Sequence, residues 1–292
     1  MKVQTAVIAA AGYGTRFLPA TKVVPKELLP IIDKPVIQYL VEEAVAAGIK
    51  DIVIVTRSGA GQVAAHFDSS RELEVYLTEQ KKYDYLAAVK ALPTLANFCQ
   101  VHQGSHLPYG NGTPILAASP FLRNEPFAYM FGDDIVLSQT PCIRQLIDVY
   151  EAHQPAAVVA FQKVPSEEIS RYASAKVKPD TDPMELEFIV EKAPPEKAPS
   201  LLAQLGRFVL HPQIIDILAR RELGLGNELY LTDAIDKLCR KNRVIAHPIE
   251  GRWHTTGDPL RFLITSIECA LRREDIAHPL AAYLRSIDLS KY

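Results

Sequence analysis

The order of strand-like and helix-like segments in the first 165 residues most constrains the fold of this chain. One helix is expected over Pro35–Ala47, with proline at its start and Gly48 just past its end. Helical segments of this kind separate short apolar runs that are typical of buried strands, at Thr5–Ala9, Asp51–Thr56, Phe98–His102, Phe127–Phe131 and Ala156–Phe161. Strands that alternate with helices form a parallel sheet that binds ligands at the carboxyl ends of its strands. The sequence therefore predicts an α/β fold of the Rossmann-like, doubly wound type, with a mixed, mostly parallel sheet and helices on both faces.

The second half of the chain has a different pattern, with strands close together and helices gathered toward the end. Strand-like segments are predicted at Tyr172–Lys178, Leu186–Glu191, Leu205–Leu210 and Val244–Ile249. Helices are predicted at His211–Arg220, Leu231–Arg240, Asp258–Arg273 and Pro279–Ile287. In the first half, Ser69-x-x-Glu72 indicates a capping box that opens a further helix.

Composition excludes several classes of function. A chain of 292 residues with 48% hydrophobic content can bury a large core, and its net charge of −2 gives no basic field for nucleic acid. The four cysteines are scattered without a C-x-x-C pair, which indicates a reducing compartment and no zinc or disulfide framework. No signal peptide and no apolar run of membrane-spanning length is found, so we expect a cytoplasmic protein without membrane contact.

The segment after the first predicted strand carries the clearest chemical signal. Gly12 and Gly14 allow the backbone to approach a phosphate, while Arg16 and Lys26 bring positive charge to the same loop. A dinucleotide fingerprint requires a third glycine where this chain has Phe17, and the chain contains no Walker A sequence. The loop offers neither a nucleophile nor an acid–base pair. It therefore indicates binding of a polyphosphate, in a transfer or binding reaction on a nucleotide.

The string from Gly12 to Pro30, GYGTRFLPATKVVPKELLP, resembles the signature of bacterial UTP–glucose-1-phosphate uridylyltransferases, a branch of the sugar-nucleotidyltransferase superfamily. Shorter matches follow in the family's order: DIVIVT, HFD, GDD, EKAPPEKAPS, GRFVL and LTDAI. The resemblance covers the chain to about Leu271. It implies a single nucleotidyltransferase domain over 1–292, with a nucleotide-binding half at about 1–165, a sugar-binding half at about 166–257 and C-terminal helices at about 258–292.

The reaction that this resemblance implies joins UTP and glucose 1-phosphate to give UDP-glucose and pyrophosphate. An oxygen of the sugar phosphate would attack the α-phosphorus in line, assisted by Mg²⁺. Because a phosphate monoester is already largely dianionic at neutral pH, no side-chain base is required. The enzyme's task is to hold two polyanions together and to stabilise the developing charge.

The resemblance also assigns roles to residues. The catalytic cations would be Arg16, Lys26 and Lys192, and Asp133 of the GDD string would bind the metal. Sugar contacts would come from Glu191, Ala173 and Gly206. The nucleotide would be bound by Ala10, Ala11, Gly12, Gly14, Thr15, Glu27, Gln103, Gly110 and Gly112.

Several residues depart from the family pattern. The chain has Thr113 and Pro114 where G-H-A is usual, Ala173 in place of the glycine of Y-G-V, and Leu201 in place of an asparagine. Thr255 stands where the superfamily offers a second acidic metal ligand, and the nearby Asp258 is expected to cap a helix.

Three alternatives for the function stay open: another sugar 1-phosphate as substrate, dTTP as nucleotide donor, or a non-catalytic nucleotide-sugar-binding regulator. A homodimer or homotetramer is expected.

Overall fold

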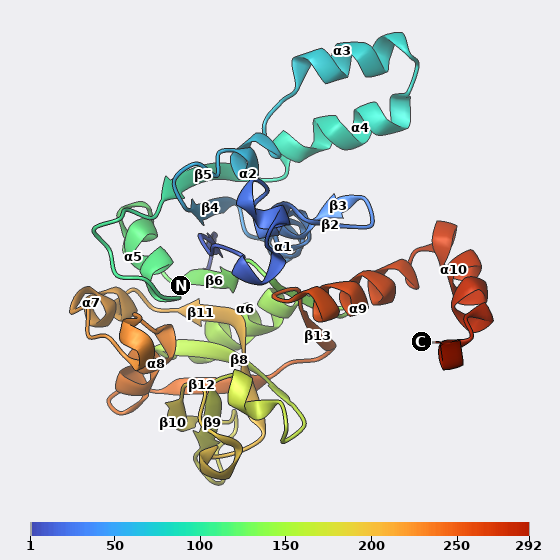
Figure 1. The fold of residues 1–292 in the computed structure, drawn as a ribbon. Helices are drawn as coiled ribbons and strands as arrows, with labels where there is room; N and C mark the ends of the chain where they lie inside the picture. Colours follow the sequence, from blue (N-terminus) through green and yellow to red (C-terminus); the bar gives the residue numbers. More distant parts are fainter. Residues whose placement is uncertain (1, 292) are drawn as a thin grey trace.

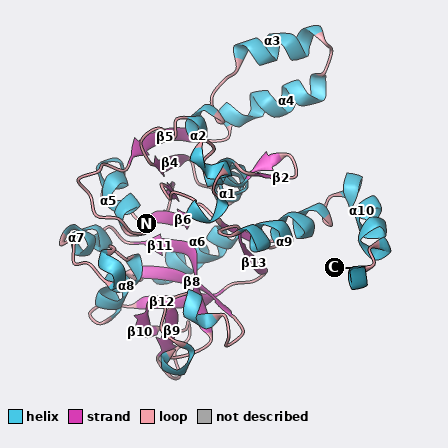
Figure 2. Ribbon diagram, in the orientation of Figure 1, coloured by secondary structure: helices cyan, strands magenta, loops and turns pink. Residues whose placement is uncertain are grey.

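A nine-stranded mixed sheet runs through the centre of the molecule in the computed structural model, which describes residues 2–291 (Figures 1 and 2). Its main path has the order β10-β9-β11-β6-β1-β4-β5, and β8 pairs with β11 and with β12. The strands of this sheet are β1 (Thr5–Ala10), β4 (Asp51–Thr56), β5 (Asn97–His102), β6 (Phe127–Phe131), β8 (Ala157–Lys163), β9 (Ser174–Val177), β10 (Leu186–Val190), β11 (Leu202–Leu210) and β12 (Val244–Pro248).

Two small ladders lie outside this sheet, and helices cover its faces. The ladders pair β2 (Pro30–Ile31) with β3 (Lys34–Pro35), and β7 (Asp134–Leu137) with β13 (Arg252–Thr255). The helices are α1 (Val36–Ala46), α2 (Gln62–Ala65), α3 (Arg71–Glu79), α4 (Tyr83–Ala91), α5 (Thr113–Ala118), α6 (Cys142–His153), α7 (Gln213–Ala219), α8 (Leu231–Cys239), α9 (Pro259–Ala270) and α10 (Glu274–Ser286).

Pairing directions divide the sheet into two regions. In the first region β1 pairs in parallel with β4 and β6, and β4 pairs in parallel with β5, as alternating strands and helices require. Around β11 the pairing with β6, β8 and β9 is antiparallel. Because β11 joins both regions, nearly all of its residues are buried.

A buried ion pair fixes β11 to its surroundings. Arg207 is 0% exposed, and its Nη2 donates to Glu43 Oε2 of α1 at 2.7 Å and to the carbonyl of Asp134 at 2.7 Å. The backbone N–H of Gly206 donates to the Asp134 carboxylate at 2.9 Å. These bonds tie α1, β7 and β11 together at Asp134, the neighbour of Asp133.

Two helical segments extend away from the sheet. Helices α3 and α4 form an antiparallel pair that projects beyond β5, and α9 and α10 carry the chain to its C-terminus on another side (Figure 1). No helix within residues 2–291 is long and apolar enough to cross a membrane.

The predicted α/β fold with a mixed sheet is confirmed, and each predicted strand is found within a few residues of its expected bounds. Helix α1 also follows the prediction, since Pro35 precedes it and Gly48 has a φ of +93° just past its end. The capping box was wrong: Ser70 precedes α3 without a side-chain cap. The start of the last helix was wrong too, because α10 begins at Glu274 and contains Pro279 in its interior.

Candidate active site

The loop after β1 is compact and brings the side chain of Lys26 back against its glycines. Gly14 has a φ of +63°, and its carbonyl accepts a hydrogen bond from Thr21 Oγ1 at 2.7 Å. A Cβ atom at Gly12 would lie 3.2 Å from Lys26 Cε. Glycine at both positions therefore permits the loop to fold closely around the lysine.

Lys26 meets the acidic pair that follows β6. Its Nζ lies 2.6 Å from Asp133 Oδ2, and the backbone N–H of Thr256 donates to the Asp133 carbonyl at 2.6 Å. Burial raises the pKa of the Asp133 carboxyl, but Lys26 and then Arg16 outweigh it and leave that pKa below its ordinary value. Both side chains are therefore charged at neutral pH.

Arg16 approaches the same carboxylate from the other side. Its Nη1 donates to the carbonyl of Gly257 at 3.2 Å. A Cβ atom on Gly257 would lie 3.2 Å from Asp133 Oδ2 and 3.6 Å from Arg16 Nη1. Two cations from the N-terminal loop and one carboxylate from the end of β6 therefore form a cluster.

Glu27 is held differently from the other charged residues of this loop. It is 1% exposed, and neither carboxylate oxygen has a hydrogen-bond partner within residues 2–291. Its nearest cation is Lys26 Nζ, at 3.9 Å. Burial raises the pKa of the Glu27 carboxyl to about 7, against a smaller opposing effect of Lys26.

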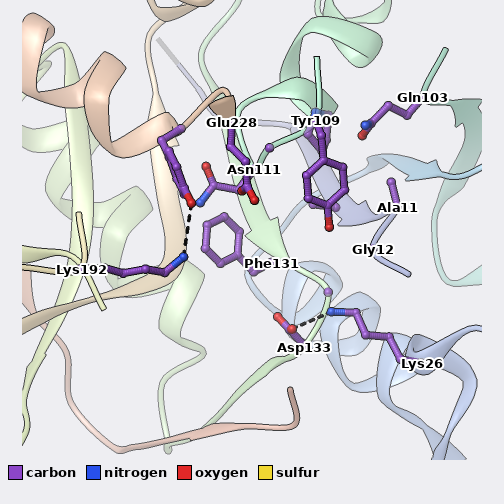
Figure 3. A pocket seen from close by; sticks show the side chains of 15 residues that line it. Ala11, Gly12, Lys26, Gln103, Tyr109, Asn111, Phe131, Asp133, Lys192 and Glu228 are labelled. Atoms are coloured by element: carbon purple, nitrogen blue, oxygen red, sulfur yellow. Dashed lines mark hydrogen bonds and ion pairs between the residues drawn. The ribbon is translucent and has the colours of Figure 1, made fainter. Parts of the chain in front are cut away.

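A cavity of about 310 Å³, the central cavity, lies over the carboxyl ends of β1 and β6 (Figure 3). Lys26 and Asp133 form one side of it, and Lys192 enters from another direction (Figure 3). Its lining residues are Ala9, Ala11, Gly12, Lys26, Gln103, Tyr109, Gly110, Asn111, Pro114, Phe131, Gly132, Asp133, Lys192, Glu228 and Tyr230.

A second cavity of about 190 Å³, the adjoining cavity, shares Asn111, Phe131, Asp133 and Lys192 with the central cavity. Glu191 lines it and accepts a hydrogen bond from Thr232 Oγ1 at 2.7 Å. Ala173 and Gly206 line it as well. A Cβ atom at Gly206 would lie 2.4 Å from Phe131 Cβ, so only glycine fits at that position.

Lys192 stands at the boundary between the two cavities. Its Nζ lies 3.4 Å from Tyr230 Oη and 3.6 Å from Glu191 Oε1. Burial lowers the pKa of this ammonium group, but Glu191 and Tyr230 outweigh burial and leave the pKa raised. Lys192 is therefore a permanent cation beside both cavities.

The oxygen atoms around Asp133 suit a magnesium ion that binds mainly to the phosphates of a bound substrate. No group of three or more His, Cys, Asp or Glu side chains in the described part of the chain could hold a metal by itself. The Asp133 carboxylate nevertheless faces both cavities, and Mg²⁺ commonly binds through one or two carboxylates together with water and substrate phosphates. Thr255 lines the adjoining cavity as a neutral hydroxyl, with its Oγ1 3.5 Å from the Asp133 carbonyl.

Several predicted nucleotide-binding residues do not line the central cavity. Gly112 packs behind it, where a Cβ atom would meet Leu218 and Leu229. The others are Ala10, Gly14, Thr15 and Glu27, and the predicted catalytic residue Arg16 also lies outside the lining. For Glu27 the reason is complete burial beneath Gly132, where a Cβ atom would lie 3.2 Å from Glu27 Cγ.

Sequence reasoning missed five polar or aromatic residues that line the central cavity: Tyr109, Asn111, Phe131, Glu228 and Tyr230. Asn111 Oδ1 accepts a hydrogen bond from the backbone N–H of Leu231 at 2.8 Å, which joins the loop before α5 to the start of α8. The position of Asn111 between Gly110 and Gly112 was the available signal. As predicted, Asp258 caps α9 by accepting from the Arg261 N–H at 3.0 Å.

Comparison with known proteins identifies the class to which this fold and site belong. The family model described as nucleotidyl transferase matches residues 5–268. The chain belongs to this family. Curated relatives named UTP–glucose-1-phosphate uridylyltransferase include a protein of Staphylococcus epidermidis, 45% identical over 99% of both chains, and YngB of Bacillus subtilis, 44% identical over 98% of this chain and 96% of that one. The predicted resemblance is confirmed.

Solved structures of similar proteins carry the same kind of name. A UDP-glucose pyrophosphorylase from Acinetobacter baumannii has a TM-score of 0.89 at 31% identity, and the match covers 98% of this chain and 100% of that one. A UDP-glucose pyrophosphorylase complexed with UDP-glucose has a TM-score of 0.83 at 34% identity, covering 93% of this chain and 100% of that one.

Proposed function

We infer that this chain is a UTP–glucose-1-phosphate uridylyltransferase that forms UDP-glucose and pyrophosphate. An oxygen of the sugar phosphate forms a bond to the α-phosphorus of UTP, and the bond from that phosphorus to the bridging oxygen of pyrophosphate breaks. The nucleophile is already anionic at neutral pH, so positioning and charge stabilisation are the main tasks of the protein.

The observation that carries this proposal is the position of Asp133 and Lys192, which line both cavities. A nucleotide in the central cavity and a sugar phosphate in the adjoining cavity would meet at these two residues. Lys192 would then hold the attacking phosphate and reduce its repulsion from the triphosphate. Because the pKa of Lys192 is raised, its positive charge is present throughout the neutral pH range.

On the nucleotide side, Lys26 and Arg16 would bind the triphosphate. Lys26 is paired with Asp133, so bound phosphates would compete with that carboxylate for the ammonium group. Gln103 and the backbone of Gly110 line the central cavity and offer both donors and acceptors to a uracil edge.

On the sugar side, Glu191 would accept hydrogen bonds from sugar hydroxyls. Its carboxylate is half satisfied by Thr232, which fixes its direction toward the adjoining cavity. Gly206 lines that cavity where Phe131 and Asp134 leave no room for a side chain, and Ala173 adds a methyl group to the lining where the family usually has glycine. These contacts would select the sugar.

Enzymes of this family generally use Mg²⁺. We propose that Asp133 is the protein ligand, together with the substrate phosphates and water. Bound there, the ion would neutralise charge on the phosphates during transfer. Since Asp133 would then be shared with a stronger cation, Lys26 would become free to bind phosphate oxygens.

A coupled assay of pyrophosphate release tests the proposal. The purified protein is assayed with UTP or dTTP in combination with several sugar 1-phosphates, and UTP with glucose 1-phosphate should give the highest kcat/KM. A single methyl in a pocket discriminates by only about 1–3 kcal/mol, so some activity with dTTP is compatible with the assignment. Preference for a different pair would favour a related transferase, and absence of turnover with every pair would favour a non-catalytic binding protein.

Replacement of Lys26, which we propose binds the triphosphate, is a second test. Lys26→Met should lower kcat about 10²–10³-fold, as loss of one electrostatic stabiliser of a transition state commonly does. The exposed Lys50→Met is the matched control and should keep wild-type activity. Self-association into a dimer or tetramer stays a prediction.

A further inference from the structure

Lys22 belongs to the signature loop, but it does not line the central or the adjoining cavity. It lines a third and larger cavity of about 670 Å³, the outer cavity. The lining of the outer cavity includes Lys22 and Arg57 and contains no aspartate or glutamate. The side chains that line the outer cavity therefore carry a net positive charge.

Arg57 is held in place by a backbone carbonyl and an aromatic ring, and the acidic group near it is the buried Glu27, which does not line the outer cavity. Its Nη2 reaches the carbonyl of Thr21 at 3.5 Å, and its guanidinium group lies 5.6 Å from the centre of the Tyr13 ring. Among residues 2–291 no salt bridge involves Arg57 or Lys22. Two cations that face one cavity without carboxylates form a site for an anion, because a charge-assisted hydrogen bond to phosphate would satisfy both.

The outer cavity lies on the ligand-binding edge of the sheet. Arg57 directly follows β4, and His102, another lining residue, ends β5. Gly59 lies in the same loop with a φ of +81°, and a Cβ atom there would meet nothing within 4 Å. In doubly wound folds ligands bind at the carboxyl ends of the strands, and this cavity occupies that position for β4 and β5.

A common wall separates the outer cavity from the central one. Ala11, Gln103 and Tyr109 line both cavities, and they lie together on the side of the central cavity away from Lys192 (Figure 3). The ring of Tyr109 stacks on that of Tyr13 at 6.2 Å with an interplanar angle of 29°. The outer cavity therefore has aromatic surface beside its two cations.

We propose that the outer cavity is a second binding site for a polyphosphate ligand, occupied while UTP fills the central cavity. The ligand class is a phosphate-bearing anion of at least two charges, supplied either by a nucleoside triphosphate or by inorganic pyrophosphate. Lys22 and Arg57 bind the phosphates. The proposal rests on the proposed function only in that it assigns the central cavity to UTP.

Equilibrium dialysis with UTP and Mg²⁺ tests this directly, because no turnover occurs without sugar phosphate. Two UTP bound per chain identify a nucleoside triphosphate as the second ligand. If one UTP binds, pyrophosphate is then titrated into the UTP-saturated protein, and binding of one equivalent identifies the inorganic ligand. One bound UTP with no binding of pyrophosphate overturns the proposal.

The double variant Lys22→Gln/Arg57→Gln tests which residues hold the second ligand. We expect its affinity at the second site to fall at least about tenfold, while the first UTP binds as before and the KM for UTP is unchanged. The matched control is Lys50→Gln/Arg285→Gln, which removes the same charge from exposed positions and should leave both binding events intact.

Two outcomes separate this proposal from competing explanations. A raised KM for UTP in the Lys22→Gln/Arg57→Gln variant would mean that the phosphates of the substrate itself extend into the outer cavity, and the proposal would fail. Loss of the second event in the control variant would indicate nonspecific charge attraction and would overturn it equally. A protein that binds the second ligand but shows no pyrophosphate release with any substrate pair would contradict the proposed function alone.

Discussion

The stability difference between Glu27→Gln and the wild-type protein should shift in favour of the variant as pH rises from 5 to 8. The Glu27 carboxyl is 1% exposed, lacks a hydrogen-bond partner for either oxygen among the described residues, and has a pKa raised to about 7 from an ordinary 4.5. Between these two pKa values the folded protein binds a proton that the unfolded chain has released. Wild-type stability from this group is therefore complete below pH 4.5 and is lost as pH rises through 7.

The size of the effect follows from the shift in pKa. Between pH 5 and pH 8 the wild-type protein should lose about 2.5 kcal/mol through Glu27, since one pKa unit corresponds to about 1.4 kcal/mol. Glutamine does not titrate, so the variant escapes this loss. For a chain of this size the difference in Tm between variant and wild type should grow by about 5 °C or more over the same pH range.

Thermal unfolding at pH 5, 6, 7 and 8 measures this difference. The change with pH is the diagnostic quantity, because the buried amide of glutamine adds a cost of its own that is the same at every pH. Glu72→Gln, in the exposed first turn of α3, is the matched control and should show no such trend. A constant difference in Tm between Glu27→Gln and wild type from pH 5 to 8 would refute the assignment of a raised pKa to this carboxyl.

Three further predictions concern the reaction. Asp133→Asn should abolish magnesium-dependent turnover, and Thr255→Asp should lower the magnesium concentration needed for half-maximal rate. Asp258→Asn should have a modest effect, because Asp258 caps α9. A titration of activity against magnesium compares all three variants, and an inactive Asp258→Asn beside an active Asp133→Asn would contradict the assignment. Glu191→Ala should raise the KM for the sugar phosphate about tenfold or more and leave the KM for UTP nearly unchanged, so equal losses for both substrates would count against separate cavities. Gly206→Ala should lower stability by about 1–3 kcal/mol and lower kcat/KM, because the added methyl group would lie 2.4 Å from Phe131 Cβ. A variant with wild-type Tm and activity would show that Phe131 can shift to accommodate the methyl group.

The parts of the site that the sequence predicted are those fixed by local chain geometry. Gly12, Lys26 and Asp133 each follow directly from a strand or its loop, so the strand pattern alone brings them to one edge of the sheet. Lys192 and its neighbour Glu191 follow β10, which pairs antiparallel with β9. The order of strands and helices placed Gly12, Lys26 and Asp133 near one another, whereas Lys192 and Glu191 were assigned to the site through the family resemblance.

The parts that the sequence did not predict depend on contacts between distant segments. Tyr230 reaches the central cavity because Asn111 binds the start of α8, a contact that no local pattern indicates. The pairing of β7 with β13 joins two four-residue strands that lack a strong alternating pattern. Glu27 was expected to bind the nucleotide, since a carboxylate suits a uracil edge, but tertiary packing buries it outside the central cavity.

Strand β11 limits how the enzyme can move. It pairs with β6, which leads to Asp133, and also with β8 and β9, so the predicted nucleotide-binding and sugar-binding halves are built on one continuous strand. A hinge between the halves would have to break buried backbone hydrogen bonds or separate Arg207 from Glu43. Motion linked to UTP binding should therefore be confined to surface loops such as 104–112, and amide hydrogen exchange should slow there on UTP binding while β11 stays protected throughout.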